Sequence, residues 1–403
     1  MGSVPQHPPS APPLSVSFYG DRGEFRRLVM RGTGLEVLTV GFYRFWLATD
    51  IRRHLWWNID IAGDGPEYTG RGKELLLGFL FALAILVPIY LAYFLVGLEV
   101  ERAKAFAGVP LFLFFYVFGQ FAIYRARRYR LTRTVWWGVR FWMSGSGWSY
   151  AARSSLWAIG VILTLGLLLP WREAALERYK MRHSYYGDLP GEFDQRGWEF
   201  FKEAWWIWLI ALVAFAVFFL TVPLAQWFPA LRPAAKIAAR AGLIVPLAAP
   251  FLYGTFKAIE WRWWLSGVRF GNVYFESALP RTALIGLYWK VVGWGLLLVI
   301  LFSAYIAGAM YLIASVNHVP MAKLFLPGQA NIPLVVLMAM GYLALILAMN
   351  VVMRMYLLRD VWARVVTSAT VYNLEAAANV SAKGELANAL GEGFADGLDV
   401  AGF

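Results

Sequence analysis

The sequence predicts an all-α polytopic membrane protein with about six long transmembrane helices, two short apolar segments, and tandem parallel repeats that carry small cytoplasmic β-hairpins. Three observations lead to this fold class. Of the 403 residues, 60% are hydrophobic and 15% are charged, whereas soluble domains are about 45–50% apolar and about 25% charged. Long uncharged stretches alternate with basic clusters. Similar sequence elements also recur at nearly constant spacing, as they do in tandem repeats.

The apolar stretches define the predicted spans in chain order. Crossing the hydrocarbon core of a bilayer takes about 20 consecutive apolar residues. Two stretches, 35–48 and 155–170, fall short of this length and could be short spans, re-entrant segments or interfacial helices. The stretches that reach it are 75–98, 105–124, 204–223, 241–259, 282–312 and 332–353.

The repeats are visible as matching residues that recur in the same order. The sequence LTVG at 38–41 returns as LTLG at 163–166, which is 125 residues later. The tetrapeptide GVRF occurs at 138–141 and again at 267–270, 129 residues later. The spacing of 129 also pairs Arg53 with Arg182, Lys73-Glu74 with Lys202-Glu203, and the GLLL of 166–169 with that of 295–298. An ordered series of this kind indicates tandem duplication.

Turn residues flanked by aromatic or branched residues precede several helices, and this pattern is typical of β-hairpins. Together with the repeats, it divides the chain into five parts. These are a disordered Pro-rich tail (1–16), a first membrane repeat (17–156), a second membrane repeat (157–290), a degenerate third repeat with the last two spans (291–365), and a cytoplasmic C-terminal tail (366–403).

The distribution of lysine and arginine predicts the orientation. If 35–48 and 155–170 do not cross, six spans remain, and 30 of these residues fall on one side of the membrane and 6 on the other. Lysine and arginine are enriched in cytoplasmic loops. Both termini are therefore expected in the cytoplasm, and the loops near 99–104, 224–240 and 313–331 are expected on the outer side.

Longer stretches resemble a known family. They are LTVGFYRFWLATDIRRHLWW at 38–57, RYRLTRTVWWGVRF at 128–141, and LTLGLLLPWREAALERYKMRHSYYGD at 163–188. The chain resembles the YjgN-like (DUF898) proteins over about residues 17–290. The resemblance implies a multi-pass protein of the bacterial inner membrane, and it carries over no catalytic residue because the family has no settled activity.

Arginine and tryptophan cluster beside the predicted spans. Tryptophan is enriched at the headgroup level of membranes, and arginine contacts lipid phosphates. These clusters are either interfacial anchors or a specific site for an anionic headgroup or phosphate. Arg140 and Arg269 are the best candidates because they share the GVRF tetrapeptide. The full candidate set is Arg53, Arg133, Arg140, Arg182, Arg269, Trp56, Trp57, Trp136, Trp137, Trp263 and Trp264.

Lys290 is a charged residue near the start of the 282–312 stretch. A lysine in this position can extend its amine to the membrane interface. A charge that stays buried in the membrane would instead mark a functional site. The sequence leaves both interpretations open.

The sequence argues against several classes of function. Cysteine is absent, which excludes disulfides and thiol catalysis. The sequence holds no HExxH, P-loop or dinucleotide motif, so we expect no enzyme activity, cofactor or metal site. The net charge of +12 is explained by cytoplasmic loops beside an anionic leaflet. Anionic membrane lipids are therefore the expected partners, and nucleic acid is not.

Two functions remain. The first is an integral inner-membrane protein that interacts with lipids or transports a small solute, because parallel repeats are a frequent transporter plan. The second is a non-catalytic membrane scaffold whose cytoplasmic hairpin layer docks a protein partner. A large polar cavity between the repeats would favour transport, and a sealed core would favour the scaffold.

Overall fold

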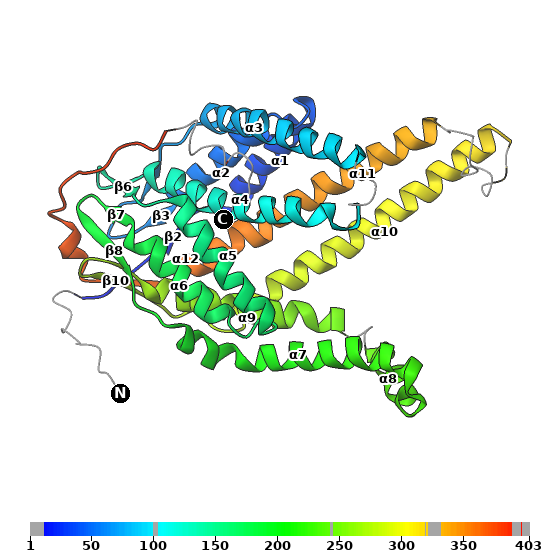
Figure 1. Cartoon of the computed structure of the whole chain (residues 1–403). Coiled ribbons are helices and arrows are strands. Elements are labelled where there is room, and N and C mark those ends of the chain that lie inside the picture. The colour runs from blue at the N-terminus through cyan, green and yellow to red at the C-terminus, as the bar shows by residue number, and fades with distance from the viewer. Residues whose placement is uncertain are drawn as a thin grey trace.

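The computed structural model describes residues 12–99, 104–241, 245–318, 320, 332–388 and 396. The strands gather at one end of the molecule, and α7, α10 and α11 extend away from them (Figure 1). The helices are α1 (Arg22–Leu38), α2 (Arg44–Trp57), α3 (Gly72–Glu99), α4 (Lys104–Thr132), α5 (Gly147–Leu163), α6 (Leu169–Arg182), α7 (Gly197–Trp227), α8 (Arg232–Ala241), α9 (Val245–Gly267), α10 (Ile285–Val316), α11 (Ile332–Met353) and α12 (Val361–Thr367).

Five helical segments in the described ranges are long and apolar enough to cross a membrane, and the architecture is that of a polytopic membrane protein. They are 72–95, 109–132, 197–217, 285–316 and 332–367. The last one continues from α11 through a π-helical segment, Arg354–Asp360, into α12. The sixth predicted span, 241–259, falls on α9, which is not among the five; residues 242–244 lie outside the described residues. That span stays a prediction.

The strands form a nine-stranded antiparallel sheet, so the prediction of an all-α fold with separate small hairpins is wrong. The strand order is β1-β11-β10-β9-β8-β7-β6-β5-β4. The turn of a hairpin can be predicted from a few neighbouring residues. The pairing of one hairpin with the next cannot, because any edge strand has unpaired backbone groups that can bond to another strand. The strands are β1 (Leu14–Ser15), β4 (Glu67–Tyr68), β5 (Thr134–Trp136), β6 (Val139–Met143), β7 (Ser184–Tyr186), β8 (Leu189–Phe193), β9 (Val268–Phe270), β10 (Val273–Ser277) and β11 (Ala369–Tyr372). A separate pair joins β2 (Ser17–Phe18) to β3 (Ile59–Asp60).

The two short apolar segments are the tips of helical hairpins. The first bends between α1 and α2, where Gly41 N–H donates to the Glu36 carbonyl at 2.7 Å. The second bends between α5 and α6, where Gly166 N–H donates to the Val161 carbonyl at 2.8 Å. Neither segment is a continuous spanning helix. Both tips expose large apolar side chains, namely Leu38, Val40, Leu163 and Leu165.

The two helical hairpins share their boundaries at a constant offset of 125. This offset relates α1 to α5 and α2 to α6, end to end. At this offset the residue equivalent to Arg53 is Arg178, so the predicted equivalence of Arg53 and Arg182 does not hold in the structure. A single residue pair can match by chance, whereas the shared helix ends and turn hydrogen bonds fix the alignment of these two hairpins.

The identical GVRF tetrapeptides also occupy different positions. In the first, Arg140 lies on β6, the second strand of its hairpin. In the second, Arg269 lies on β9, the first strand of its hairpin. A Val-Arg-Phe sequence suits any half-buried strand, so identity over four residues does not establish equivalence.

Both predicted tails contribute to the sheet. Leu14 and Ser15 form β1 and pair with β11, while residues 1–11 lie outside the described residues. Strand β11 lies between β1 and β10. The chain after it, which we call the C-terminal strap (378–388), contacts the sheet: Ser381 N–H donates to Asp188 Oδ1 at 3.1 Å. The predicted tails, 1–16 and 366–403, therefore each include residues that belong to the folded structure.

Candidate functional site at the junction of helices and sheet

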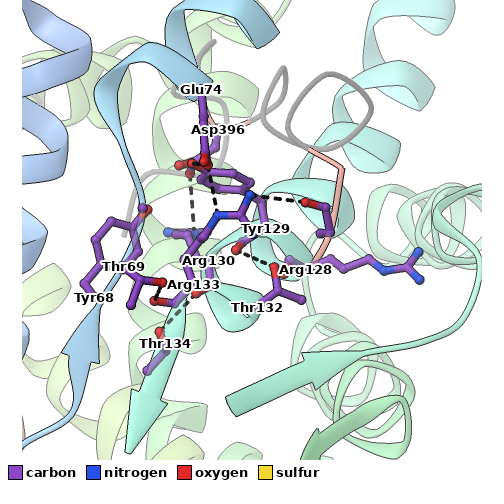
Figure 2. Close-up of polar contacts among 12 residues, drawn as sticks. Tyr68, Thr69, Glu74, Arg128, Tyr129, Arg130, Thr132, Arg133, Thr134 and Asp396 are labelled. Carbon is purple, nitrogen blue, oxygen red and sulfur yellow. Dashed lines mark hydrogen bonds and ion pairs between the residues drawn. The ribbon is translucent and has the colours of Figure 1, made fainter. Parts of the chain in front are cut away.

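A cluster of buried arginines lies where α2 and α4 reach the sheet (Figure 2). Arg52 on α2 forms a two-pronged ion pair with Asp396, in which Nη2 is 3.0 Å from Oδ1. The two side chains are 3% and 2% exposed. Arg130 on α4 contributes its Nε at 3.6 Å from the same carboxylate. Asp396 is thus held against α2 and α4 by two arginines.

The second half of this cluster joins α3 to α4. Arg133 Nε donates to Glu74 Oε2 at 2.9 Å, and the Tyr129 hydroxyl donates to the same oxygen at 2.8 Å. Arg133 Nη2 also donates to the Ala387 carbonyl of the C-terminal strap at 3.3 Å. Figure 2 shows Glu74, Tyr129 and Arg133 converging at this point. Arginines therefore contact both the strap, at Ala387, and the later residue Asp396.

Electrostatics keep Arg52 charged. Burial opposes its charge, but the Asp396 carboxylate and the Tyr68 hydroxyl outweigh that effect and raise the pKa of Arg52 above its ordinary value. Burial also raises the pKa of Tyr68, whose hydroxyl oxygen accepts a bond from Arg52 Nη1 at 3.3 Å. Arg52 and Asp396 therefore form a charged, buried pair that anchors Asp396 to α2.

A polar groove of about 1020 Å³ lies beside α1 and α2. Its lining includes Arg27, Arg31 and Arg53, together with Asp50 and Trp57. Arg53 Nη2 donates to the Gly70 carbonyl at 2.7 Å, and Nη1 is 3.7 Å from Asp50 Oδ1. The Trp57 side chain is 70% exposed. The lining also includes the carboxylates of Glu24 and Glu67. Two of the predicted headgroup residues, Arg53 and Trp57, are therefore neighbours on an open surface that carries both arginines and carboxylates.

The other predicted arginines have separate environments. Arg133 is buried in the cluster described above. Arg140 Nη1 donates to the Thr132 carbonyl at 2.5 Å. Arg269 forms an ion pair with Asp194. Arg182 is exposed at the end of α6. These arginines do not form one common anion site.

The predicted tryptophans divide between core and surface. Trp136 and Trp263 are buried in two hydrophobic clusters. Trp137 stacks on Trp136 with ring centroids 4.2 Å apart. Trp56 stacks on Trp362 at 4.9 Å, and Trp264 lies edge-on to Trp261 at 5.6 Å. Most of them stabilise the sheet and the adjoining helix ends, and headgroup contact stays a prediction for the exposed residues.

A family comparison covers nearly the whole fold. The family described as bacterial protein of unknown function (DUF898) matches residues 13–396. The chain belongs to the DUF898 family. The match extends from Pro13, beside β1, to Asp396 in the arginine cluster, so it includes both chain ends that complete the sheet and the cluster. No curated protein and no solved structure matches the chain.

The family match confirms the predicted resemblance and extends it beyond residue 290. The contact between Arg52 and Asp396, however, joins residues 344 positions apart in this DUF898 chain. The C-terminal tail carries only a few acidic residues among glycines and apolar residues. Nothing in that local pattern indicates which arginine such a carboxylate meets, so sequence reasoning missed the pair.

The internal partners of Arg140 and Arg269 lead to a prediction. A variant with both Arg140→Lys and Arg269→Lys is expected to retain as much bound cardiolipin and phosphatidylglycerol as the wild type. Each arginine already faces a protein acceptor, Thr132 or Asp194, rather than open solvent. Lipids that co-purify with the two proteins can be counted by mass spectrometry. Marked lipid loss in the double variant would instead support a phosphate site that needs the guanidinium fork.

Proposed function

We propose that this DUF898 protein is an integral protein of the bacterial inner membrane that binds anionic lipids at the sheet-side ends of its helices. The supporting observation is the set of exposed basic side chains on α1 and α2. Arg26, Arg27, Arg31 and Arg53 stand near apolar spans that carry few charges. A basic residue near an anionic leaflet contributes about 1 kcal/mol of attraction.

The orientation that goes with this proposal puts the sheet in the cytoplasm. Strands β1 and β11 pair side by side, with Leu14 opposite Val371, so the two ends of the described chain lie on the same side of the molecule. The 30-to-6 distribution of lysine and arginine favours the cytoplasm for that side. Both termini would then be cytoplasmic.

Tandem duplication is part of the same proposal. In the first unit, a Cβ on Gly72 would lie 2.9 Å from Trp46 Cα. In the second, a Cβ on Gly197 would lie 2.7 Å from Trp171 Cα. Both residue pairs are related by the offset of 125 that relates the helical hairpins. The same glycine–tryptophan contact thus fixes a long span to a helical hairpin twice.

Lipid binding is favoured over solute transport by the position of the polar groove. That groove is lined by α1, α2, β4 and the residues beside them, all within the first unit. A transport path of the expected kind would run between the two repeats. The groove and its exposed tryptophan suit a membrane interface better.

The proposal is tested by reconstituting the protein in bilayers with equal amounts of phosphatidylglycerol and phosphatidylcholine. The protein is then extracted in mild detergent, and native mass spectrometry identifies the lipids that stay bound. We expect phosphatidylglycerol to predominate among the retained lipids. A variant with Arg27→Gln, Arg31→Gln and Arg53→Gln should weaken this preference. Equal retention of both lipids by the wild-type protein would refute anionic-lipid binding.

A further inference from the structure

A second groove, of about 810 Å³, lies between α1, α10 and α11. We call it the lateral groove. Its volume is within the range of about 300–1,000 Å³ that is usual for ligand pockets. Its lining consists mostly of apolar side chains with basic residues at one end: Arg22, Gly23, Arg26, Met30, Thr33, Gly34, Val37, Trp294, Leu298, Leu347, Ala348, Val351, Val352, Met355 and Tyr356.

The lining residues form stripes along the helices. On α1, the spacing of Arg22, Arg26, Met30 and Val37 places them on one face. On α10, Trp294 and Leu298 line the groove, and Lys290 lies one turn before them, at its mouth beside Tyr356. Both helices begin at the sheet side of the molecule. The basic residues of both stripes therefore lie at the sheet side, and the apolar residues lie further along the spans.

The basic end of the groove is organised around Tyr356. The Lys290 ammonium lies over its ring at 5.9 Å, and the Arg22 guanidinium lies over it at 5.0 Å. Trp294 Nε1–H donates to the Tyr356 hydroxyl at 3.1 Å. Arg22 is paired with Asp360 at 3.1 Å. Among the described residues, neither Arg26 nor Lys290 has a carboxylate partner, so both can bind an external anion.

The wall of the groove contains an unusual backbone segment. Residues Arg354–Asp360 form a π-helix, and Met355 and Tyr356 within it line the groove. Such segments are rare and occur frequently at functional sites. The segment is fixed to α1 by Arg354, whose Nη2 is 2.9 Å from Glu36 Oε1. The groove is thus a built concave site with a fixed wall, unlike the flat apolar surface of a spanning helix.

We propose that the lateral groove binds one anionic phospholipid. Its phosphate lies between Arg26 and Lys290, and an acyl chain lies along Met30, Val37 and Leu298. On α1, Val37 lies 15 positions after Arg22, or about 22 Å along the helix, whereas half of the hydrocarbon core is about 15 Å thick. A headgroup and a chain of one leaflet both fit. This proposal rests on the proposed function and assigns it a specific site.

Three variants test the headgroup end of this site, its acyl-chain end, and a control position. Arg26→Gln with Lys290→Gln removes the headgroup contacts. Gly34→Phe places a ring in the groove, where a Cβ meets open space at present. Arg71→Gln with Lys73→Gln is the matched control, because it removes one exposed arginine and one exposed lysine that line neither groove. Size-exclusion chromatography and circular dichroism identify any variant that fails to fold.

The measurement is the fraction of protein that keeps one phosphatidylglycerol or one phosphatidylcholine in native mass spectrometry. We expect the headgroup variant to lose phosphatidylglycerol affinity about 5-fold per removed charge, the equivalent of about 1 kcal/mol each. The Gly34→Phe variant should lose both lipids. The control variant should keep the one tightly held phosphatidylglycerol.

The failures of the two proposals are distinguishable. If the wild-type protein prefers phosphatidylglycerol but neither groove variant changes its retention, lipid binding stands and the lateral groove is excluded as the site. If the wild-type protein shows no preference, the proposed function itself fails. Displacement of the retained lipid by millimolar inorganic phosphate would also overturn the inference, because the site would then recognise a free anion.

Discussion

Replacing Arg52 by methionine is expected to lower the free energy of unfolding by about 3 kcal/mol, at the low end of the range for a broken buried ion pair. The substitution keeps most of the side-chain volume but leaves the Asp396 carboxylate, which is 2% exposed, without its two-pronged partner. Arg130 remains 3.6 Å from Asp396 and offsets part of the loss. Thermal unfolding in detergent measures the effect. Protease removal of a C-terminal tag should also become faster.

The neighbouring residue provides the control. Arg53 pairs with Asp50 in a contact in which the side chains are 49% and 41% exposed. Such surface pairs contribute about 0–1 kcal/mol, and the hydrogen bond of Arg53 to the Gly70 carbonyl adds about 1 kcal/mol. Arg53→Met should therefore lower the unfolding temperature clearly less than Arg52→Met. Equal destabilisation by the two substitutions would show that the contact with Asp396 does not stabilise the C-terminal segment.

Replacing Gly197 by alanine is expected to cost about 1–3 kcal/mol, as overpacking of a closely packed site does. The new Cβ would lie 2.7 Å from Trp171 Cα and 2.8 Å from the Pro170 carbonyl oxygen. Both are backbone atoms, so the clash requires the long span α7 to move away from α6. The equivalent substitution, Gly72→Ala, should cost a similar amount, because its Cβ would lie 2.9 Å from Trp46 Cα.

Gly293→Ala is the control for these glycines. It lies on α10, and no atom is within 4 Å of its added Cβ. Alanine is favoured over glycine in a helix by about 1 kcal/mol, so this variant should be unchanged or more stable. If Gly72→Ala is tolerated while Gly197→Ala is not, the two glycine–tryptophan contacts are not equivalent. They would then no longer support a tandem duplication.

The spanning helices could be predicted from sequence because their determinants are local. A helix of about 20 apolar residues is as long as the hydrocarbon core of a membrane is thick, so the length of an apolar run predicts a span. The five helical segments that meet the criterion coincide with five of the predicted stretches. The short segments 35–48 and 155–170 could only be narrowed to three possibilities, because their length does not distinguish a short span from a bend. The Gly41 and Gly166 turns exclude a continuous spanning helix at either segment.

The sheet and the buried cluster could not be predicted because their determinants are distant in sequence. Strand β11 pairs with β1 although Val371 and Leu14 lie at opposite ends of the chain. Arg52 lies next to the candidate Arg53, but its partner Asp396 lies in a tail that gives no periodic signal. Identical GVRF tetrapeptides were a misleading guide, because Arg140 and Arg269 occupy different strands of their hairpins.

The orientation of the sheet relative to the membrane is the central claim, and single cysteines test it directly. The natural sequence contains no cysteine, so Ser146→Cys and Ser315→Cys each introduce one thiol. Ser146 lies three residues after β6, a strand of the sheet, and is the N-cap of α5. Ser315 lies 30 residues beyond the start of α10, or about 45 Å along the helix, which exceeds the hydrocarbon thickness of about 30 Å.

The measurement is labelling by a membrane-impermeant maleimide in intact spheroplasts and after permeabilisation. With the sheet in the cytoplasm, the Ser315→Cys protein is labelled in intact cells, and the Ser146→Cys protein is labelled only after permeabilisation. Labelling of Ser146→Cys in intact spheroplasts, with protection of Ser315→Cys, would place the sheet outside and contradict the account.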